Sequence, residues 1–367
     1  MPLSSCFQTV SFKDLPGWKE DRQADAFAAF QRSAFRIHVK PYRSGSLGIT
    51  SESLEPACAE ARSAGQLSDS AAKSFFERHF LPALIVPENG GGLVTGFYEP
   101  EVDASPMQVG RFTVPLLSRP HDLVDIDETN RPKEMDSYLA FARDTSEGLV
   151  PYFDRAEIDQ GALAGRGLEI AWLADPVDAF FIHVQGAARL RMTDGRLRRV
   201  TYAAKAGHRF TGIGKVLADI GEIPLAEVTM QSIRAWLKAN PSRVDEILWQ
   251  NRSYIFFREA PVENPTLGPV AAAKVPLTPG RSIAVDRLLH TFGTPFYIDA
   301  PKLTAFDGLP FRRLMIAQDT GSAITGAARG DLFAGSGDAA GEIAGVVRNE
   351  ASFYVLLPRP LVEAQRR

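Results

Sequence analysis

Short runs of β-branched and aromatic residues, each bounded by turn-forming residues, constrain the fold of this chain more than any other feature. Gly occurs 30 times and Pro 25 times in 367 residues, which fits a turn-rich chain better than a helical bundle. We therefore expect a mainly β fold with minor helices. The apolar runs predict strands at 167–173, 180–184, 253–258, 282–285, 295–298, 314–316 and 352–357.

Helical spacing of apolar residues interrupts these strands in a few segments. It predicts helices at 21–35, 68–80, 229–238 and 240–249. A chain of 367 residues is too long for one ordinary domain, so we expect two.

The charge and residue counts exclude several classes of partner and cofactor. Lys and Arg total 41 against 44 Asp and Glu, so no basic excess points to nucleic acid. The six histidines are scattered without metal-ligand spacing, and two cysteines are too few for a Cys-based zinc site. No apolar run reaches the roughly 18 residues of a membrane span. We therefore expect no metal, no cofactor and no nucleic acid.

The segment at 316–338 carries the strongest chemical signal. A predicted strand runs into Asp319, a Gly- and Ser-rich turn follows, and Asp331 and Asp338 come after it. If the loop folds back, neighbouring carboxyls in a partly dry site raise the pKa of one of them. Such an acid can protonate a leaving oxygen near neutral pH. Two other interpretations stay open: Asp beside Gly is common in turns, and such loops can bind calcium, although the alternating ligand spacing is missing.

This segment and others in the same order resemble the membrane-bound lytic transglycosylase A family with its three-aspartate domain. The resemblance implies an enzyme that cleaves the β-1,4 bond between N-acetylmuramic acid and N-acetylglucosamine in peptidoglycan without water, leaving 1,6-anhydro ends. It also implies a double-psi β-barrel built from 1–107 and 262–367, with a smaller β-rich domain inserted at 108–261 that completes a saccharide cleft. The matching stretches lie at 95–100, 152–158, 175–186, 202, 207–208, 251–257, 275–286 and 318–341.

The resemblance also implies roles for single residues. Asp331 matches the catalytic acid, which would first protonate the glycosidic oxygen and then, as carboxylate, take the proton of the sugar 6-hydroxyl. Asp319 is expected to orient Asp331 or raise its pKa. Two departures affect fine substrate contacts: Ala187-Ala188 replaces the usual Ser-Gly, and 205–207 replaces a Gln-Asn-Gly stretch. The residues expected to bind substrate are Thr95, Tyr98, Gln185, Gly186, Tyr202 and Asp338.

Two other functions compete with this one. An inverting peptidoglycan hydrolase would use a second carboxylate, such as Asp319, to place water. A non-catalytic glycan-binding module would keep Tyr98 and Gln185 but would need no acid with a raised pKa. Glu99, a further carboxyl near this segment, is expected to face solvent because it precedes Pro100.

The expected partner is the peptidoglycan glycan strand. We expect a monomeric protein in the periplasm, attached to the outer membrane only through a lipid anchor. No exporting segment is visible. The sequence LSSC at 3–6 has the form of a lipoprotein cleavage box but lacks the preceding apolar stretch. A lipid on Cys6 and a Cys6–Cys58 disulfide both stay open.

Overall fold

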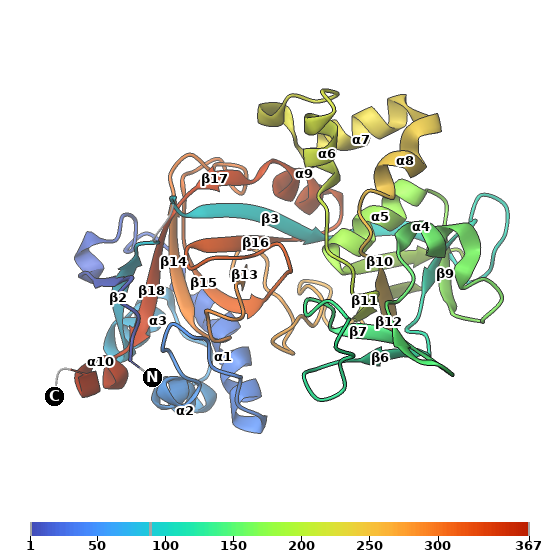
Figure 1. The fold of residues 1–367 in the computed structure, drawn as a ribbon. Coiled ribbons are helices and arrows are strands. Elements are labelled where there is room, and N and C mark those ends of the chain that lie inside the picture. Colours follow the sequence, from blue (N-terminus) through green and yellow to red (C-terminus); the bar gives the residue numbers. More distant parts are fainter. Residues whose placement is uncertain (1, 88–89, 366–367) are drawn as a thin grey trace. The chain divides into compact units, whose positions relative to one another are not determined.

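The structure is a computed structural model that describes residues 2–87 and 90–365 (Figure 1). The chain forms two compact units: Met1–Tyr98 together with Pro265–Arg367, and Glu99–Asn264. The assignment of 1–107 and 262–367 to one catalytic domain, with 108–261 inserted, stays a prediction. Strands and helices each account for 29% of the chain, and the fold is mainly β with some helices.

The first unit is organised around a nine-stranded sheet with the order β1-β2-β18-β14-β15-β13-β16-β3-β17. Both ends of the chain contribute strands to it. The order is open among the described residues, and no pairing there closes it into a barrel. Its strands are β1 Phe7–Thr9, β2 Phe80–Ile85, β3 Leu93–Glu99, β13 Ser282–Val285, β14 Pro295–Ala300, β15 Phe311–Asp319, β16 Arg329–Ser336, β17 Arg348–Glu350 and β18 Ser352–Pro358.

Helices of the first unit pack their aromatic rings against one another. Phe27 and Phe30 lie on one face of the longest helix and are fully buried against Phe75 and Phe76, with ring centroids 4.9 Å apart for Phe27 and Phe75. The Ser68 hydroxyl caps the helix that carries the last two. The helices are α1 Gln23–Val39, α2 Glu55–Ser63, α3 Asp69–His79, α9 Asp338–Val346 and α10 Arg359–Gln365, with 3-10 turns η1 Phe12–Asp14 and η2 Glu52–Leu54.

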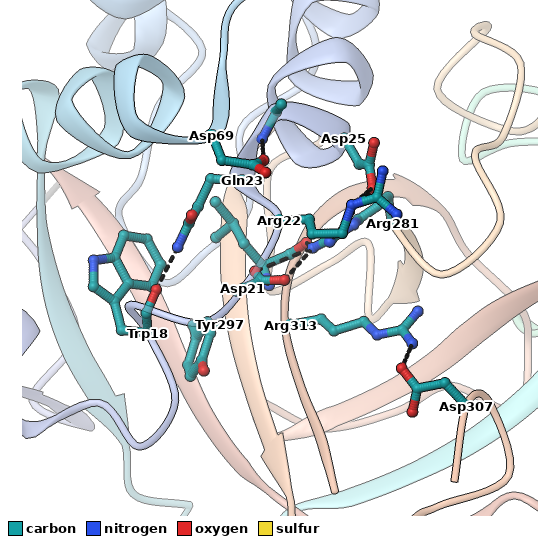
Figure 2. Close-up of polar contacts among 12 residues, drawn as sticks. Trp18, Asp21, Arg22, Gln23, Asp25, Asp69, Arg281, Tyr297, Asp307 and Arg313 are labelled. Atoms are coloured by element: carbon teal, nitrogen blue, oxygen red, sulfur yellow. Dashed lines mark hydrogen bonds and ion pairs between the residues drawn. The ribbon is translucent and has the colours of Figure 1, made fainter. Parts of the chain in front are cut away.

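A buried ion pair joins the N-terminal segment to the sheet. The Asp21 carboxylate lies 2.8 Å from Nη1 of Arg281, directly before β13, and accepts the N–H of Leu314 in β15 at 2.7 Å (Figure 2). Nη1 of Arg281 also donates to the Leu314 carbonyl. These bonds fix the relative positions of β13 and β15, the second of which ends at Asp319.

The second unit contains a six-stranded sheet, β12-β11-β10-β4-β9-β5, and a three-stranded sheet, β6-β7-β8. Its strands are β4 Glu101–Ser105, β5 Val114–Leu117, β6 Leu123–Asp125, β7 Phe141–Thr145, β8 Gly148–Val150, β9 Glu169–Leu173, β10 Ala187–Met192, β11 Leu197–Lys205 and β12 Ile255–Ala260. Its helices are α4 Arg155–Glu157, α5 Pro176–Gln185, α6 Ile213–Asp219, α7 Met230–Ala239 and α8 Val244–Leu248, with short turns η3 Ile158–Ala162, η4 Leu225–Glu227 and η5 Pro241–Arg243.

The strand predicted at 180–184 is wrong, because this segment lies in helix α5. The Asp175 carboxylate accepts the N–H of Val177 at 2.8 Å, Pro176 occupies the first turn, and Gly186 ends the helix in a left-handed conformation. Residues 179–183 of this helix are all buried. A helix buried on all sides shows no helical periodicity, and its apolar run then looks like a strand.

Glu99, expected to face solvent, has an exposed fraction of 0%. Its carboxylate accepts Nε of Arg189 at 3.0 Å and both Nε and Nη2 of Arg199, from neighbouring strands β10 and β11. A buried carboxylate is tolerated when charged partners surround it in this way.

Two further sequence questions have structural answers. Cys6 and Cys58 form no disulfide with each other, and Cys58 is buried. None of the helices in the described part of the chain is long and apolar enough to cross a bilayer.

The Asp21–Arg281 pair leads to a stability prediction. Asp21→Ala leaves the Arg281 guanidinium buried without its main partner and should lower the free energy of unfolding by about 3–5 kcal/mol. Urea denaturation measures the change. Asp25→Ala is the control, because Asp25 is half-exposed and lies 3.8 Å from the same arginine; its cost should stay below about 1 kcal/mol. Equal losses in the two variants would contradict a structural role for the buried pair.

Candidate active site

Asp319 and Asp331 lie on the two strands that flank β13. Strand β13 pairs in parallel with β15 and antiparallel with β16, and Ala284 is the register partner of both aspartates. Paired residues project from the same face of a sheet. The two carboxyls therefore stand on one face, on either side of the Ala284 methyl group, next to a β-bulge between Ile283 and Ala284.

The loop between the two aspartates is fixed against the end of β13. Thr320 donates its hydroxyl to the Val285 carbonyl at 2.8 Å, and Gly326 donates its N–H to the Asp286 carboxylate at 2.9 Å. The chain thus folds back after Asp319 and re-enters the sheet as β16, as the Gly- and Ser-rich sequence predicts.

The Asp331 carboxyl takes part in a short chain of hydrogen bonds. The Thr95 hydroxyl, from β3, donates to Oδ1 of Asp331 at 2.6 Å, and Nη2 of Arg329 donates to the Thr95 oxygen at 2.8 Å. Burial raises the pKa of Asp331, while the Thr95 hydrogen bond and the Arg329 charge lower it in part. The net effect is a raised pKa, which suits a proton donor.

The Asp319 carboxyl has a raised pKa of about 6. Burial is the largest cause, and the charge of Asp331 raises this pKa further. Backbone N–H groups of Thr320 and Ala272 and the ammonium of Lys274 act in the opposite direction. Lys274 itself has a φ of 60°, a left-handed conformation that a non-glycine residue adopts at some cost.

Other residues expected at the site lie in the same unit. Asp338 is exposed at the first residue of α9, where its charge favours the helix N-terminus. Tyr98 is buried, and a Cβ added to Gly341 in α9 would come within 2.8 Å of its ring. Tyr98 therefore packs its ring on α9, and only a glycine fits opposite it.

Gln185, Gly186 and Tyr202 come together in the second unit. Gln185 is the last residue of α5, and the Gly186 carbonyl accepts the N–H of Tyr202 at 2.8 Å. The Tyr202 side chain is 42% exposed, so its ring is accessible. The structure thus groups these three residues by themselves and groups Asp319, Asp331 and Thr95 in the other unit.

Arg329 is the residue of this group that the sequence-based prediction missed. It precedes Asp331 by two positions on the same strand, so both side chains project from the same face. That period-two spacing was the available signal.

The side chains around Asp319 and Asp331 suit proton transfer better than metal binding. No group of three or more His, Cys, Asp or Glu side chains able to hold a metal ion occurs among the described residues. Two carboxyls with raised pKa values on one face of a sheet can act as proton donors and acceptors.

Similarity to known proteins covers most of the chain. The MltA specific insert domain matches residues 93–258, and the 3D domain matches 281–357. Membrane-bound lytic murein transglycosylase A of Escherichia coli strain K12 is 33% identical over 274 residues, which cover 72% of this chain and 66% of that protein. The match thus spans just under two thirds of the length of that relative.

Two solved structures extend the similarity to the fold. The crystal structure of a membrane-bound lytic murein transglycosylase from Agrobacterium tumefaciens has a TM-score of 0.92 and 52% identity, covering 98% of this chain and 99% of that one. The structure of E. coli MltA with bound chitohexaose has a TM-score of 0.69 and 27% identity, covering 98% and 96%.

The raised pKa of Asp319 predicts a pH-dependent effect on stability. The folded-state pKa, about 6, exceeds the 3.8 of an unperturbed aspartic acid, so folding favours the neutral carboxyl. This contribution is complete at pH values below the unfolded pKa and is lost as the pH rises through about 6. The free energy of unfolding of Asp319→Asn, relative to that of the natural protein, should therefore rise by about 1–2 kcal/mol between about pH 4 and pH 8, allowing for partial exposure. Urea unfolding at a series of pH values measures this difference; a constant or shrinking difference would contradict it.

Proposed function

The chain belongs to the membrane-bound lytic murein transglycosylase A family, and from this premise we propose that it is a lytic transglycosylase of peptidoglycan. The reaction would cleave the β-1,4 bond between N-acetylmuramic acid and N-acetylglucosamine and leave a 1,6-anhydro end. One observation carries the proposal: a carboxyl with a raised pKa, Asp331, is held in a fixed orientation beside a second carboxyl, Asp319.

In the first step Asp331 acts as the general acid. Its proton passes to the glycosidic oxygen while the bond from that oxygen to the anomeric carbon breaks, and positive charge develops on the sugar ring. Burial supports this role because it keeps the carboxyl protonated at a pH where a free aspartic acid would be ionised.

In the second step the same carboxyl acts as the base. The 6-hydroxyl of the sugar attacks the anomeric carbon, and its proton passes to the Asp331 carboxylate, so no water is consumed and the acid is restored. The attacking group is part of the substrate, which gives it a high effective concentration. Asp319 would orient Asp331, raise its pKa, or stabilise the positive charge on the sugar.

Substrate binding is proposed for Thr95, Tyr98, Gln185, Gly186, Tyr202 and Asp338. The proximity of Tyr202 to Gly186 supports a shared role for the members in the second unit. Chitohexaose bound to E. coli MltA is an oligosaccharide, which supports glycan binding by this chain. We propose that peptidoglycan glycan strands are its partner and that it works as a monomer.

Location and barrel topology complete the proposal. Because the substrate lies outside the cytoplasmic membrane, we propose a periplasmic protein attached to the outer membrane, in keeping with relatives named as membrane-bound.

Strands β13 to β16 would belong to the double-psi β-barrel implied by the resemblance, and the parallel pairing of β13 with β15 supports this.

An inverting hydrolase is the second candidate, because a second carboxyl stands across one strand from Asp331. Adjacent strands lie about 5 Å apart, so strands on either side of β13 are about 10 Å apart, near the carboxyl spacing of inverting glycosidases. A hydrolase would release ordinary reducing ends. The two candidates therefore differ in their products.

Mass spectrometry of soluble products from purified peptidoglycan tests the proposal. We expect muropeptides lighter by one water than hydrolysis products. Asp331→Asn should lower their formation by at least about a hundredfold, because the variant cannot transfer the proton. Asp307→Asn, at a half-exposed carboxyl paired with Arg313, is the control and should retain activity.

Two results would contradict this function. Products with full-mass reducing ends would identify a hydrolase and give Asp319 the role of placing water. Peptidoglycan binding without products, unchanged in Asp331→Asn, would identify a glycan-binding module.

A further inference from the structure

Arg329 is in an unusual position for a cation beside a proton donor, because it does not contact the carboxyl directly. Its Nη2 donates to the Thr95 hydroxyl at 2.8 Å, and that hydroxyl donates to Oδ1 of Asp331 at 2.6 Å. Its Nη1 donates to the carbonyl of Gly330, which anchors the guanidinium along β16. The side chain is half-buried, so water screens it only in part.

The direction of these hydrogen bonds follows from the chemistry of the groups. A guanidinium carries only donors and keeps its protons in proteins, so the Thr95 oxygen must accept from Arg329. The single proton of the hydroxyl is then left to point at Oδ1 of Asp331. A proton on Oδ1 would add a second donor to the Thr95 oxygen and deprive the hydroxyl proton of its acceptor. The arrangement therefore favours Oδ1 as an acceptor in both protonation states of the carboxyl.

We propose that Arg329 is a positioning residue which, through the Thr95 hydroxyl, reserves Oδ1 of Asp331 as a hydrogen-bond acceptor and so directs the transferable proton to Oδ2. The proposal rests on the function proposed above, in which Asp331 gives up and regains one proton. A proton held on one defined oxygen can be aimed at the glycosidic oxygen and returned to the same place.

The same contacts adjust the strength of the acid. Burial raises the pKa of Asp331, and the Thr95 hydrogen bond and the Arg329 charge lower it in part. Other charged groups near this network are Asp319 on β15, which interacts with Asp331, Lys274, which faces Asp319, and Arg348 on β17, which interacts with Arg329. Only Arg329 is joined to Asp331 through a hydrogen-bonded hydroxyl among the charged groups that the structure describes there.

The first test compares Arg329→Met with Arg329→Lys. Methionine has similar length but no charge or donor, so kcat should fall about tenfold, the rate equivalent of one lost hydrogen bond to a charged group, with little change in KM. The alkaline limb of the pH profile should move to higher pH, because the Asp331 proton is then held more tightly. Lysine keeps a cation and a donor and should restore part of kcat and return the limb towards its original position. Arg348→Met is the matched control: it removes an exposed cation on β17, two strands from β16 in the sheet, and should leave the profile in place.

The second test asks whether Arg329 acts through Thr95. Thr95→Val removes the hydroxyl, and the double variant with Arg329→Met should then lose no more kcat than Thr95→Val alone. If the two substitutions lower kcat independently, so that their effects multiply in the double variant, the proposal is overturned. So would a lower kcat in Arg329→Met with an unmoved pH profile, which is the result that a merely structural role predicts. Thermal unfolding of each variant confirms that the proteins compared are folded.

The third test is independent of activity. The side-chain carboxyl carbon of Asp331, observed by carbon-13 NMR in the resting protein, should titrate at higher pH in Arg329→Met than in the natural protein. An unmoved midpoint would overturn the proposal even if the enzyme is active. A moved midpoint in a protein that releases no anhydro products would keep the hydrogen-bond network and reject the proposed function.

Discussion

Loss of solvent around two carboxyl groups is the physical condition on which the candidate site depends. Burial raises the pKa of Asp331 and Asp319 and so favours their protonated forms. The same burial is unfavourable to folding whenever either group ionises, so the surrounding sheet must supply the stability. Active sites commonly contain such groups, whose chemistry is gained at the expense of the stability of the fold.

The stability that holds the aspartates comes from both ends of the chain. Thr95 lies on β3, before the second unit, whereas Asp331 lies on β16, after it. Asp21 connects the N-terminal segment to Arg281 and to β15, and Gln318 donates to the Ala29 carbonyl in α1 and accepts the hydroxyl proton of Ser282. The site is therefore assembled by contacts between distant parts of the sequence, which explains why no single segment of the chain contains it.

The sequence predicted the elements whose signals are local and missed the features that depend on tertiary contacts. The strand at 282–285 coincides with β13, and the Gly- and Ser-rich turn after Asp319 does fold back toward Asp331. Helix α5 was mistaken for a strand because five consecutive residues, 179–183, are buried and show no helical periodicity. Glu99 was placed in solvent because its two arginine partners lie about 100 residues further along the chain. Arg329 was missed because its hydrogen bond to Thr95 spans more than 230 positions.

The register of β13 has a consequence for how such a site can change over generations. Ala284 separates the two aspartates by a single methyl group, and its alignment with both strands holds only in this register. A slip of one residue would turn Ala284 to the other face and set Ile283 or Val285 between the acids, with a branched side chain in the space where the carboxyls interact. An insertion or deletion within this four-residue strand would therefore disrupt the site. The loop of 320–328 only has to return the chain to β16, so it can vary in length and composition. Variation in length should accordingly occur in the loop of 320–328 and not in β13.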